Sequence, residues 1–294
     1  MKRIVSTVLA LLLVTAMAHA QFGGLTDKLN KAGDKISKAK KISDDYAPWN
    51  AEQEDAVGKA SAAKMVHIFG TVDDEAAVKY VALVGNAVAQ SAPRDVPYHF
   101  AILNTDAITA FALPGGYVFV TRGALAAMKN EAELAGVIAH EVAHVDGRHL
   151  EKEVRQKKAS SWAMQKASSK VPGPSELRDI ANDMVTTALT MSYSRDKELD
   201  ADKKGTQFAA AAGYSPTGLK DLLETLKAKQ DDAKVQRALG MWNSSHPPLE
   251  ERIATLSALT VAYPVGQTVE KRFTDAMSAA GLAAAPAPTG GTSR

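Results

Sequence analysis

The sequence contains no cysteine in its 294 residues. Without thiols the chain can form no disulfide and can offer no thiolate to a metal ion. It also has no cysteine behind a leader to carry a lipid, so we expect no lipoprotein anchor. Any metal site in this protein must therefore use histidine and carboxylate side chains.

Long apolar runs and an excess of one charge are also missing. No stretch approaches the roughly 18 uninterrupted apolar residues of a membrane-spanning helix. The chain has 35 Lys and Arg against 33 Asp and Glu, and two of the basic residues, Lys2 and Arg3, lie in a predicted leader. Removing them leaves 33 of each sign. A neutral chain gives no global electrostatic reason to expect nucleic acid or an anionic membrane as a partner.

The first twenty residues have the pattern of a secretory signal peptide. A charged start precedes an apolar run over 4–14 and the sequence AHA, which ends at Ala20. We therefore expect cleavage after Ala20 and a periplasmic mature protein. Residues 21–45 alternate apolar and charged side chains at helical spacing, which predicts an amphipathic arm that packs on its own domain or docks on a membrane or partner protein. Residues 283–294 have the composition of a disordered tail.

The pattern over residues 46–282 predicts one mainly helical α+β domain. Helical periodicity from 73 to 92 ends before a proline, and a later helix, capped by Asn130 with Glu133 as its capping-box partner, is expected to run to about Lys158. Between them lie three short β-prone runs, YHFAIL (98–103), ITAFAL (108–113) and YVFVT (117–121). These runs predict a small sheet of at least three strands.

The sequence HEVAH occupies residues 140–144, inside that later helix. On a helix His140 and His144 lie about 40° apart around the axis and one turn apart along it, so both imidazoles can bind one cation. Glu141 lies about 100° from His140, outside the same ligand shell but within reach of a water beside the metal. The pattern therefore predicts a metal site with Glu141 as general base.

Catalytic zinc usually takes three protein ligands, so a third is needed. The metzincin pattern H-E-x-x-H-x-x-G-x-x-H requires a last histidine where this chain has Leu150. Gly147 fits that pattern, but His149 stands one residue too early. We interpret His149, together with His67 and His99, as an ordinary structural or surface residue.

A carboxylate from a later helix is the other candidate for the third ligand. Several acids lie between residues 179 and 202, and spacing alone leaves the choice among them open. Glu198 is the best candidate, because Asp202 lies one turn further along the same helical face and can orient a ligand histidine.

Four ordered segments make a family resemblance specific. They are AFALPGGYVFVTRGAL (110–125), HEVAH (140–144), SRDKELDAD (194–202) and HPPLEERI (246–253). Together they resemble the HtpX / CAAX-prenyl-endopeptidase / Oma-type family of gluzincin zinc metallopeptidases, over roughly residues 50–260. The resemblance implies a zincin-like fold, a Zn²⁺ cofactor and polypeptide substrates.

The resemblance also implies roles for individual residues. It makes Glu141 the general base and Asp202 an outer partner of a zinc ligand, while Arg195 is placed to pair with either Asp202 or Glu198 by helical spacing. The implied zinc ligands are His140, His144 and Glu198.

His246 precedes a proline, which favours an extended loop conformation. The resemblance implies that this histidine faces the zinc, where it either stabilises the oxyanion or covers the metal at rest. It also implies a strand edge beside which a substrate peptide binds, formed by Ala112, Leu113, Gly115 and Gly116. Thr109 departs from the family, which usually has asparagine there, so the start of this strand needs another source of support.

These expectations combine into a secreted, periplasmic zinc endopeptidase that acts on misfolded or unfolded envelope proteins. An alternative is a chaperone-like envelope protein that binds unfolded chains and keeps a closed or structural zinc site. The glutamate beside the first histidine favours the enzyme, because a site without turnover needs no general base.

Overall fold

The computed structural model describes residues 48–162, 171–246 and 248–282. Residues 49–158 and 171–282 belong to one compact unit. The predicted leader, the arm over residues 21–45 and the tail over 283–294 lie outside the described residues. Within the described part of the chain, no helix is both long and apolar enough to cross a membrane.

The three β-prone runs form the predicted sheet. Strands β1 (His99–Leu103), β2 (Ala110–Leu113) and β3 (Tyr117–Thr121) are arranged in the order β1-β3-β2. β3 pairs parallel with β1 and antiparallel with β2. The small mixed sheet confirms the predicted α+β class, and it leaves β2 at one edge.

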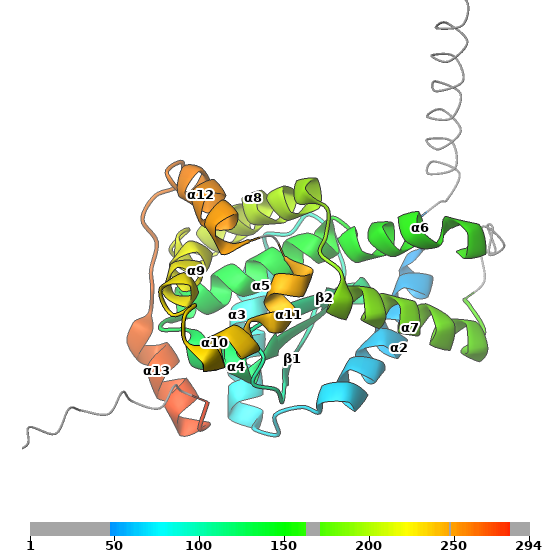
Figure 1. The fold of residues 1–294 in the computed structure, drawn as a ribbon, viewed down its shortest axis with the longest axis horizontal. Coiled ribbons are helices and arrows are strands. Elements are labelled where there is room, and N and C mark those ends of the chain that lie inside the picture. The colour runs from blue at the N-terminus through cyan, green and yellow to red at the C-terminus, as the bar shows by residue number, and fades with distance from the viewer. Residues whose placement is uncertain (1–47, 163–170, 247, 283–294) are drawn as a thin grey trace, which may run out of the picture. The chain divides into compact units, whose positions relative to one another are not determined.

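Helices make up most of the described residues (Figure 1). Before and within the sheet region they are α2 (Ala51–Phe69), α3 (Glu75–Ala89), the short 3-10 helix η1 (Pro114–Gly116) and α4 (Arg122–Ala127). After it come α5 (Glu131–Asp146), α6 (His149–Trp162), α7 (Pro174–Thr190), α8 (Arg195–Ala211), α9 (Gly218–Ala228), α10 (Ala233–Ala238), α11 (Gly240–Ser245), α12 (Leu249–Thr260) and α13 (Glu270–Ala279).

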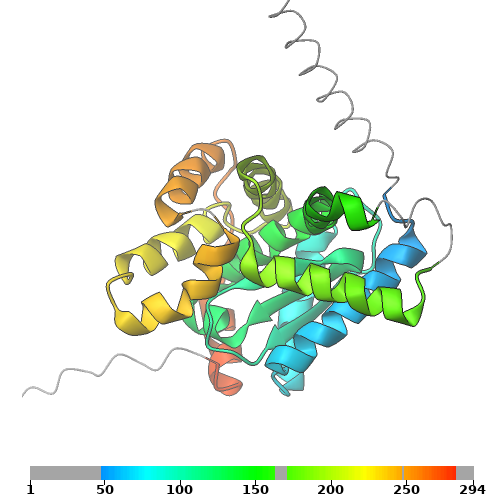
Figure 2. The same ribbon diagram turned by 45° about the vertical axis from the view of Figure 1, so that its right-hand side comes forward.

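Helix α5 is the centre of the domain. It packs against β2 and β3 on one side and against α3, α8 and α9 on others, while α2 and α7 lie side by side across another part of the sheet (Figures 1 and 2). Every residue of α5 from Glu131 to Val145 is buried. A helix covered on all sides explains why the HEVAH segment is so rich in small and apolar residues.

The start of α5 is close to the prediction. The Asn130 side chain accepts a hydrogen bond from the Glu133 backbone N–H at 3.0 Å. The Glu133 carboxylate, however, accepts from the Lys129 N–H at 2.8 Å, one residue before the predicted partner. The first turn of α5 is therefore capped by two side chains, those of Asn130 and Glu133.

The predicted continuation of this helix to Lys158 is wrong. α5 ends at Asp146 and α6 begins at His149, because Arg148 takes a left-handed backbone conformation with φ of 50°. A left-handed residue cannot continue a right-handed helix, so the chain changes direction there.

Thr121 supports the start of β2, where the family usually has asparagine. The Thr121 hydroxyl oxygen lies 2.6 Å from the Ala107 oxygen and 2.9 Å from the Thr109 oxygen, so its one hydrogen can go to either, and it accepts from the Thr109 N–H at 3.2 Å. A partner strand thus supplies the hydrogen bonds that Thr109 cannot make by itself.

Candidate metal centre and active site

Four buried side chains from three parts of the chain converge on one point. α5 supplies His140 and His144, α8 supplies Glu198, and the segment between α11 and α12 supplies His246. One ligand atom from each lies within 4.8 Å of the other three. The two Nε2 atoms of His140 and His144 are 3.0 Å apart, and each lies 3.7 Å from a Glu198 oxygen.

A glycine allows α8 to come close enough to α5. A Cβ placed on Gly205 would lie 2.9 Å from the backbone nitrogen of His140, so a larger residue would force the helices apart. The close approach turns one face of α8 toward His140, and that face carries Glu198 and Asp202 one turn apart.

Asp202 and Arg252 support His140 from behind. An Asp202 oxygen lies 3.0 Å from the His140 Nδ1 atom, and Arg252 donates to both carboxylate oxygens of Asp202, at 2.5 and 3.2 Å. Asp202 and Arg252 are each only 2% exposed. Burial works to raise the pKa of Asp202, but Arg252 and His140 outweigh it and hold that pKa well below its usual range.

His144 has different neighbours. The Tyr193 ring stacks on it, with centroids 4.2 Å apart and an interplanar angle of 22°. The Nδ1 atom of His144 lies 2.9 Å from the Nδ1 atom of the buried His149. Burial lowers the pKa of His149 to about 4, so its ring is neutral near pH 7.

Glu141 sits in the same buried region and is 2% exposed. Burial raises the pKa of its carboxyl group, although the nearby His140 and His246 act in the opposite direction. For Glu198, burial again works to raise the pKa, but His246 and His140 outweigh it and the net shift is downward. The pKa values of the two carboxyl groups are therefore shifted in opposite directions.

The donor set fits a tetrahedral zinc ion. Nitrogen and oxygen ligands at about 2.0–2.1 Å from such an ion stand about 3.4 Å from one another, close to the separations found here. The Nδ1 atoms of His140 and His144 face Asp202 and His149, which leaves both Nε2 atoms for a metal. These residues supply nitrogen and oxygen donors only, as a chain without cysteine requires.

Arg195 does not lie where helical spacing suggested. Its side chain is 81% exposed and pairs with Glu251 on α12, so the predicted pairing with Glu198 or Asp202 is wrong. The first turn of α8 points Arg195 outward, and the buried position beside Asp202 is taken by Arg252.

Three contacts of the centre are not indicated by motif spacing. Arg252 belongs to the same HPPLEERI segment as His246, so its place in that motif is the signal that could have indicated it. Tyr193 directly precedes the SRDKELDAD segment. His149 looks ordinary in the sequence because it fails as a metzincin ligand, but its contact is with His144 rather than with a metal.

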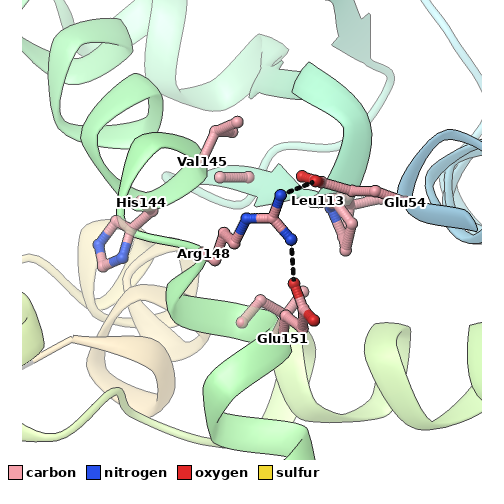
Figure 3. Close-up of a pocket in the computed structure, with 9 residues that line it drawn as sticks. Glu54, Leu113, His144, Val145, Arg148 and Glu151 are labelled. Atoms are coloured by element: carbon pink, nitrogen blue, oxygen red, sulfur yellow. Dashed lines mark hydrogen bonds and ion pairs between the residues drawn. The ribbon is translucent and has the colours of Figure 1, made fainter. Parts of the chain in front are cut away.

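The predicted substrate edge lies at the end of β2 and in η1. Ala112 and Leu113 are buried, and together with His144 they line a small pocket (Figure 3). Gly115 and Gly116 have φ of 72° and 84°, which favours glycine. A Cβ on Gly116 would also lie 2.1 Å from the Pro97 oxygen, so this turn has no room for a side chain.

Similarity to known proteins identifies the family. The model of peptidase family M48 matches residues 75–260, which is more than half of the chain. The chain belongs to peptidase family M48. This membership confirms the family resemblance, and the matched range contains all four converging side chains.

Several named proteases are similar to the chain. A beta-barrel assembly-enhancing protease of Escherichia coli K12 is 29% identical over 191 residues, or 62% of this chain and 39% of the relative. The mitochondrial metalloendopeptidase OMA1 of Schizosaccharomyces pombe is 30% identical over 56% of the chain and 48% of the relative. Metalloprotease YcaL of E. coli K12 is 33% identical over 53% and 59%. The matches thus span about two fifths to three fifths of these relatives' length.

Proposed function

We propose that the chain is a zinc endopeptidase that cleaves unfolded or misfolded proteins of the cell envelope. The observation that carries this proposal is the convergence of His140, His144 and Glu198 beside a buried glutamate, in a chain of family M48. Bound zinc would supply a Lewis acid that polarises the scissile carbonyl and lowers the pKa of water. His140, His144 and Glu198 would be its protein ligands, and His246 lies within the same group of side chains.

Glu141 would move the protons in this reaction. Its pKa is raised by burial, which suits a base that must accept a proton from the attacking water and then release it to the leaving amine. Asp202 and Arg252 would keep the His140 ring in place through the whole cycle, because their contacts with it involve no reacting atom.

The edge strand β2 would take the substrate backbone, although all four of its residues are buried and the segments that cover them would have to give way. Thr109 lies opposite Thr121, accepts a hydrogen bond from its N–H and donates one to its hydroxyl. Hydrogen-bonded and non-hydrogen-bonded positions alternate along an antiparallel pair, so the amide groups of Ala110 and Ala112 point away from β3. An extended peptide would pair with that outer edge as an added strand. Such pairing uses the main-chain N–H and C=O groups of the substrate, which are free in an unfolded segment and already paired in most folded proteins, so it favours unfolded segments.

An envelope location has two supports. The first twenty residues carry the pattern of a signal peptide, and one relative is named for enhancing β-barrel assembly, a process that concerns outer-membrane proteins. The arm over residues 21–45 is a proposed contact for a membrane surface or a partner protein. The chaperone-like alternative has no such support, since the relatives described above are all named as proteases.

The test is cleavage of a permanently unfolded reporter by the purified mature chain. We expect cleavage that stops when a chelator removes the metal and returns when zinc is added back, while a folded form of the reporter is spared. Cleavage that persists at full rate in the chelator, after metal analysis shows no bound zinc, would contradict the proposal.

His246 has two proposed roles, and the geometry favours one. Its Nδ1 atom lies 3.1 Å from both Glu198 oxygens, where it can serve as a fourth metal donor and cover the site at rest. His246 is also one of the residues that line a surface cavity next to Leu239 and Pro248, although its side chain is only 2% exposed.

We therefore expect His246→Ala to cleave a short peptide faster than the parent. If the covered arrangement holds about nine chains in ten, removing the ring raises turnover about tenfold. Steady-state kinetics on one peptide measure this, with His67→Ala on the exposed end of α2 as the control. Slower turnover would instead assign His246 to oxyanion stabilisation.

A further inference from the structure

The corner between α5 and α6 is held by an unusual set of buried contacts. Arg148 is one of two non-glycine residues with positive φ in the described part of the chain. Its guanidinium lies 3.0 Å from Glu54 and 3.2 Å from Glu151 (Figure 3). It also donates to the Trp49 carbonyl at 2.9 Å. Both carboxylates are 3% exposed. A left-handed backbone conformation at a non-glycine residue is strained and persists only where its surroundings fix it, as they do here.

The turn at Arg148 determines where the His149 ring lies relative to His144. In a continuous helix, residue 149 would stand about 140° around the axis from His144, and the two rings could not meet. With the turn, the His149 ring comes back against the end of α5. It occupies the space where a side chain on Gly147 would start, with its Nε2 atom 2.2 Å from that Cβ position. Gly147 and Arg148 together thus bring His149 to His144.

The contact between the two rings fixes their protons. Their Nδ1 atoms are 2.9 Å apart, so one must donate and the other must accept. If His144 gives its Nε2 lone pair to a metal, its proton stands on Nδ1 and it is the donor. His149 then accepts at Nδ1, which leaves its own proton on Nε2. That Nε2 atom lies 3.3 Å from an Asp200 oxygen, whose negative charge favours a proton at this nitrogen.

We propose that His149 is a positioning residue for the metal centre: it holds His144 in the tautomer and ring orientation that present Nε2 to the ion. This inference rests on the proposed function, since it needs a metal at His144. The two ligand histidines would then be supported differently, His140 by the charged pair Asp202 and Arg252, and His144 by the neutral His149 with Asp200 behind it.

The test is the zinc affinity of His149→Leu, measured on the full mature chain by competition with a chromophoric chelator. Losing an outer partner of a ligand histidine typically weakens metal binding about 10–100-fold, and we expect a loss in that range. His149→Gln keeps an acceptor oxygen and should recover part of the affinity. His67→Leu, which removes an exposed histidine, should bind zinc like the parent.

A second pair of variants covers the case in which His149→Leu does not fold. Asp200 is 39% exposed and pairs with Lys204 at 3.0 Å as well as with His149. We expect Asp200→Ala to weaken zinc binding, while Lys204→Ala, which removes the lysine that pairs with both Asp200 and Asp146, leaves it unchanged. Histidine-selective nitrogen spectra of the zinc-loaded parent should show His144 protonated at Nδ1.

The outcomes separate this inference from the proposed function. If the parent binds zinc tightly and folded His149→Leu binds it equally well, the positioning role is wrong while the peptidase proposal stands. A loss of thermal stability without a loss of zinc affinity would also overturn the positioning role, because it assigns His149 to packing only. If the parent binds no zinc, both proposals fail.

Discussion

Replacing Glu141 with glutamine should lower the rate of peptide cleavage by about 10²–10⁴-fold, the usual contribution of a general base. Glutamine has nearly the same size and can still accept a hydrogen bond, but it cannot take a proton at neutral pH. Since the side chain is buried and its carboxyl pKa is raised, the substitution also removes a charge that is costly to bury. The folded state should therefore be as stable as the parent or more so.

Kinetics and metal analysis of the same preparation measure this effect. We expect Glu141→Gln to retain one zinc per chain, because Glu141 lies outside the converging donor set. His140→Gln is the matched comparison, since it should lose both zinc and activity. A Glu141→Gln chain that cleaves the unfolded reporter at the parental rate would show that another group accepts the proton.

Replacing Arg252 with alanine should lower the free energy of unfolding by about 3–5 kcal/mol, as expected when one partner of a buried ion pair is removed. Arg252 is buried, donates to both Asp202 oxygens and lies over the Trp242 ring at 5.2 Å. Alanine would leave the Asp202 charge without its main partner and open a cavity beside Trp242.

The control for this prediction is Arg195→Ala. Arg195 also pairs with a carboxylate, Glu251, but its side chain is 81% exposed, so its loss should change stability by less than about 1 kcal/mol. Denaturant unfolding of the zinc-free chains separates the packing effect from metal binding. Equal stabilities for the two variants would contradict the description of Asp202 and Arg252 as a buried supporting pair.

The pH dependence of the stability difference between the parent and Arg252→Ala follows from the pKa of Asp202. Its pKa in the folded chain is depressed below the ordinary value of 3.8, so the folded state binds its proton less readily than the unfolded state. The stabilisation is then fully present above the ordinary pKa and is lost as pH falls toward the depressed one. The difference between the parent and Arg252→Ala should shrink in acid and stay constant near neutrality.

Part of the centre could be predicted from local spacing, because His140, Glu141 and His144 share one turn of helix and Glu198 and Asp202 share one face of another. Spacing left the third ligand open among several acids, and the family resemblance selected Glu198. The three strands are predictable for a similar reason, since their β-branched and aromatic runs are bounded by turn residues.

The errors have a common physical origin in tertiary contacts. Nothing local stops the helix before Arg148; the turn depends on Glu54 and Trp49, about a hundred residues earlier in the chain. Helical spacing puts Arg195 beside Asp202 because it reveals only helical neighbours, whereas the real partner, Arg252, comes from a different helix. The role proposed for His149 is hidden in the sequence for the same reason, because it exists only once the chain turns.

The most direct test of the metal centre is the zinc content of the parent and of Glu198→Ala, measured by native mass spectrometry. We expect one zinc per parent chain and none on Glu198→Ala under the same conditions, because the remaining two histidines of α5 and His246 would lack the only anionic ligand of the group. A parent chain that binds no zinc, or a Glu198→Ala chain that binds it as tightly as the parent, would contradict the proposed centre.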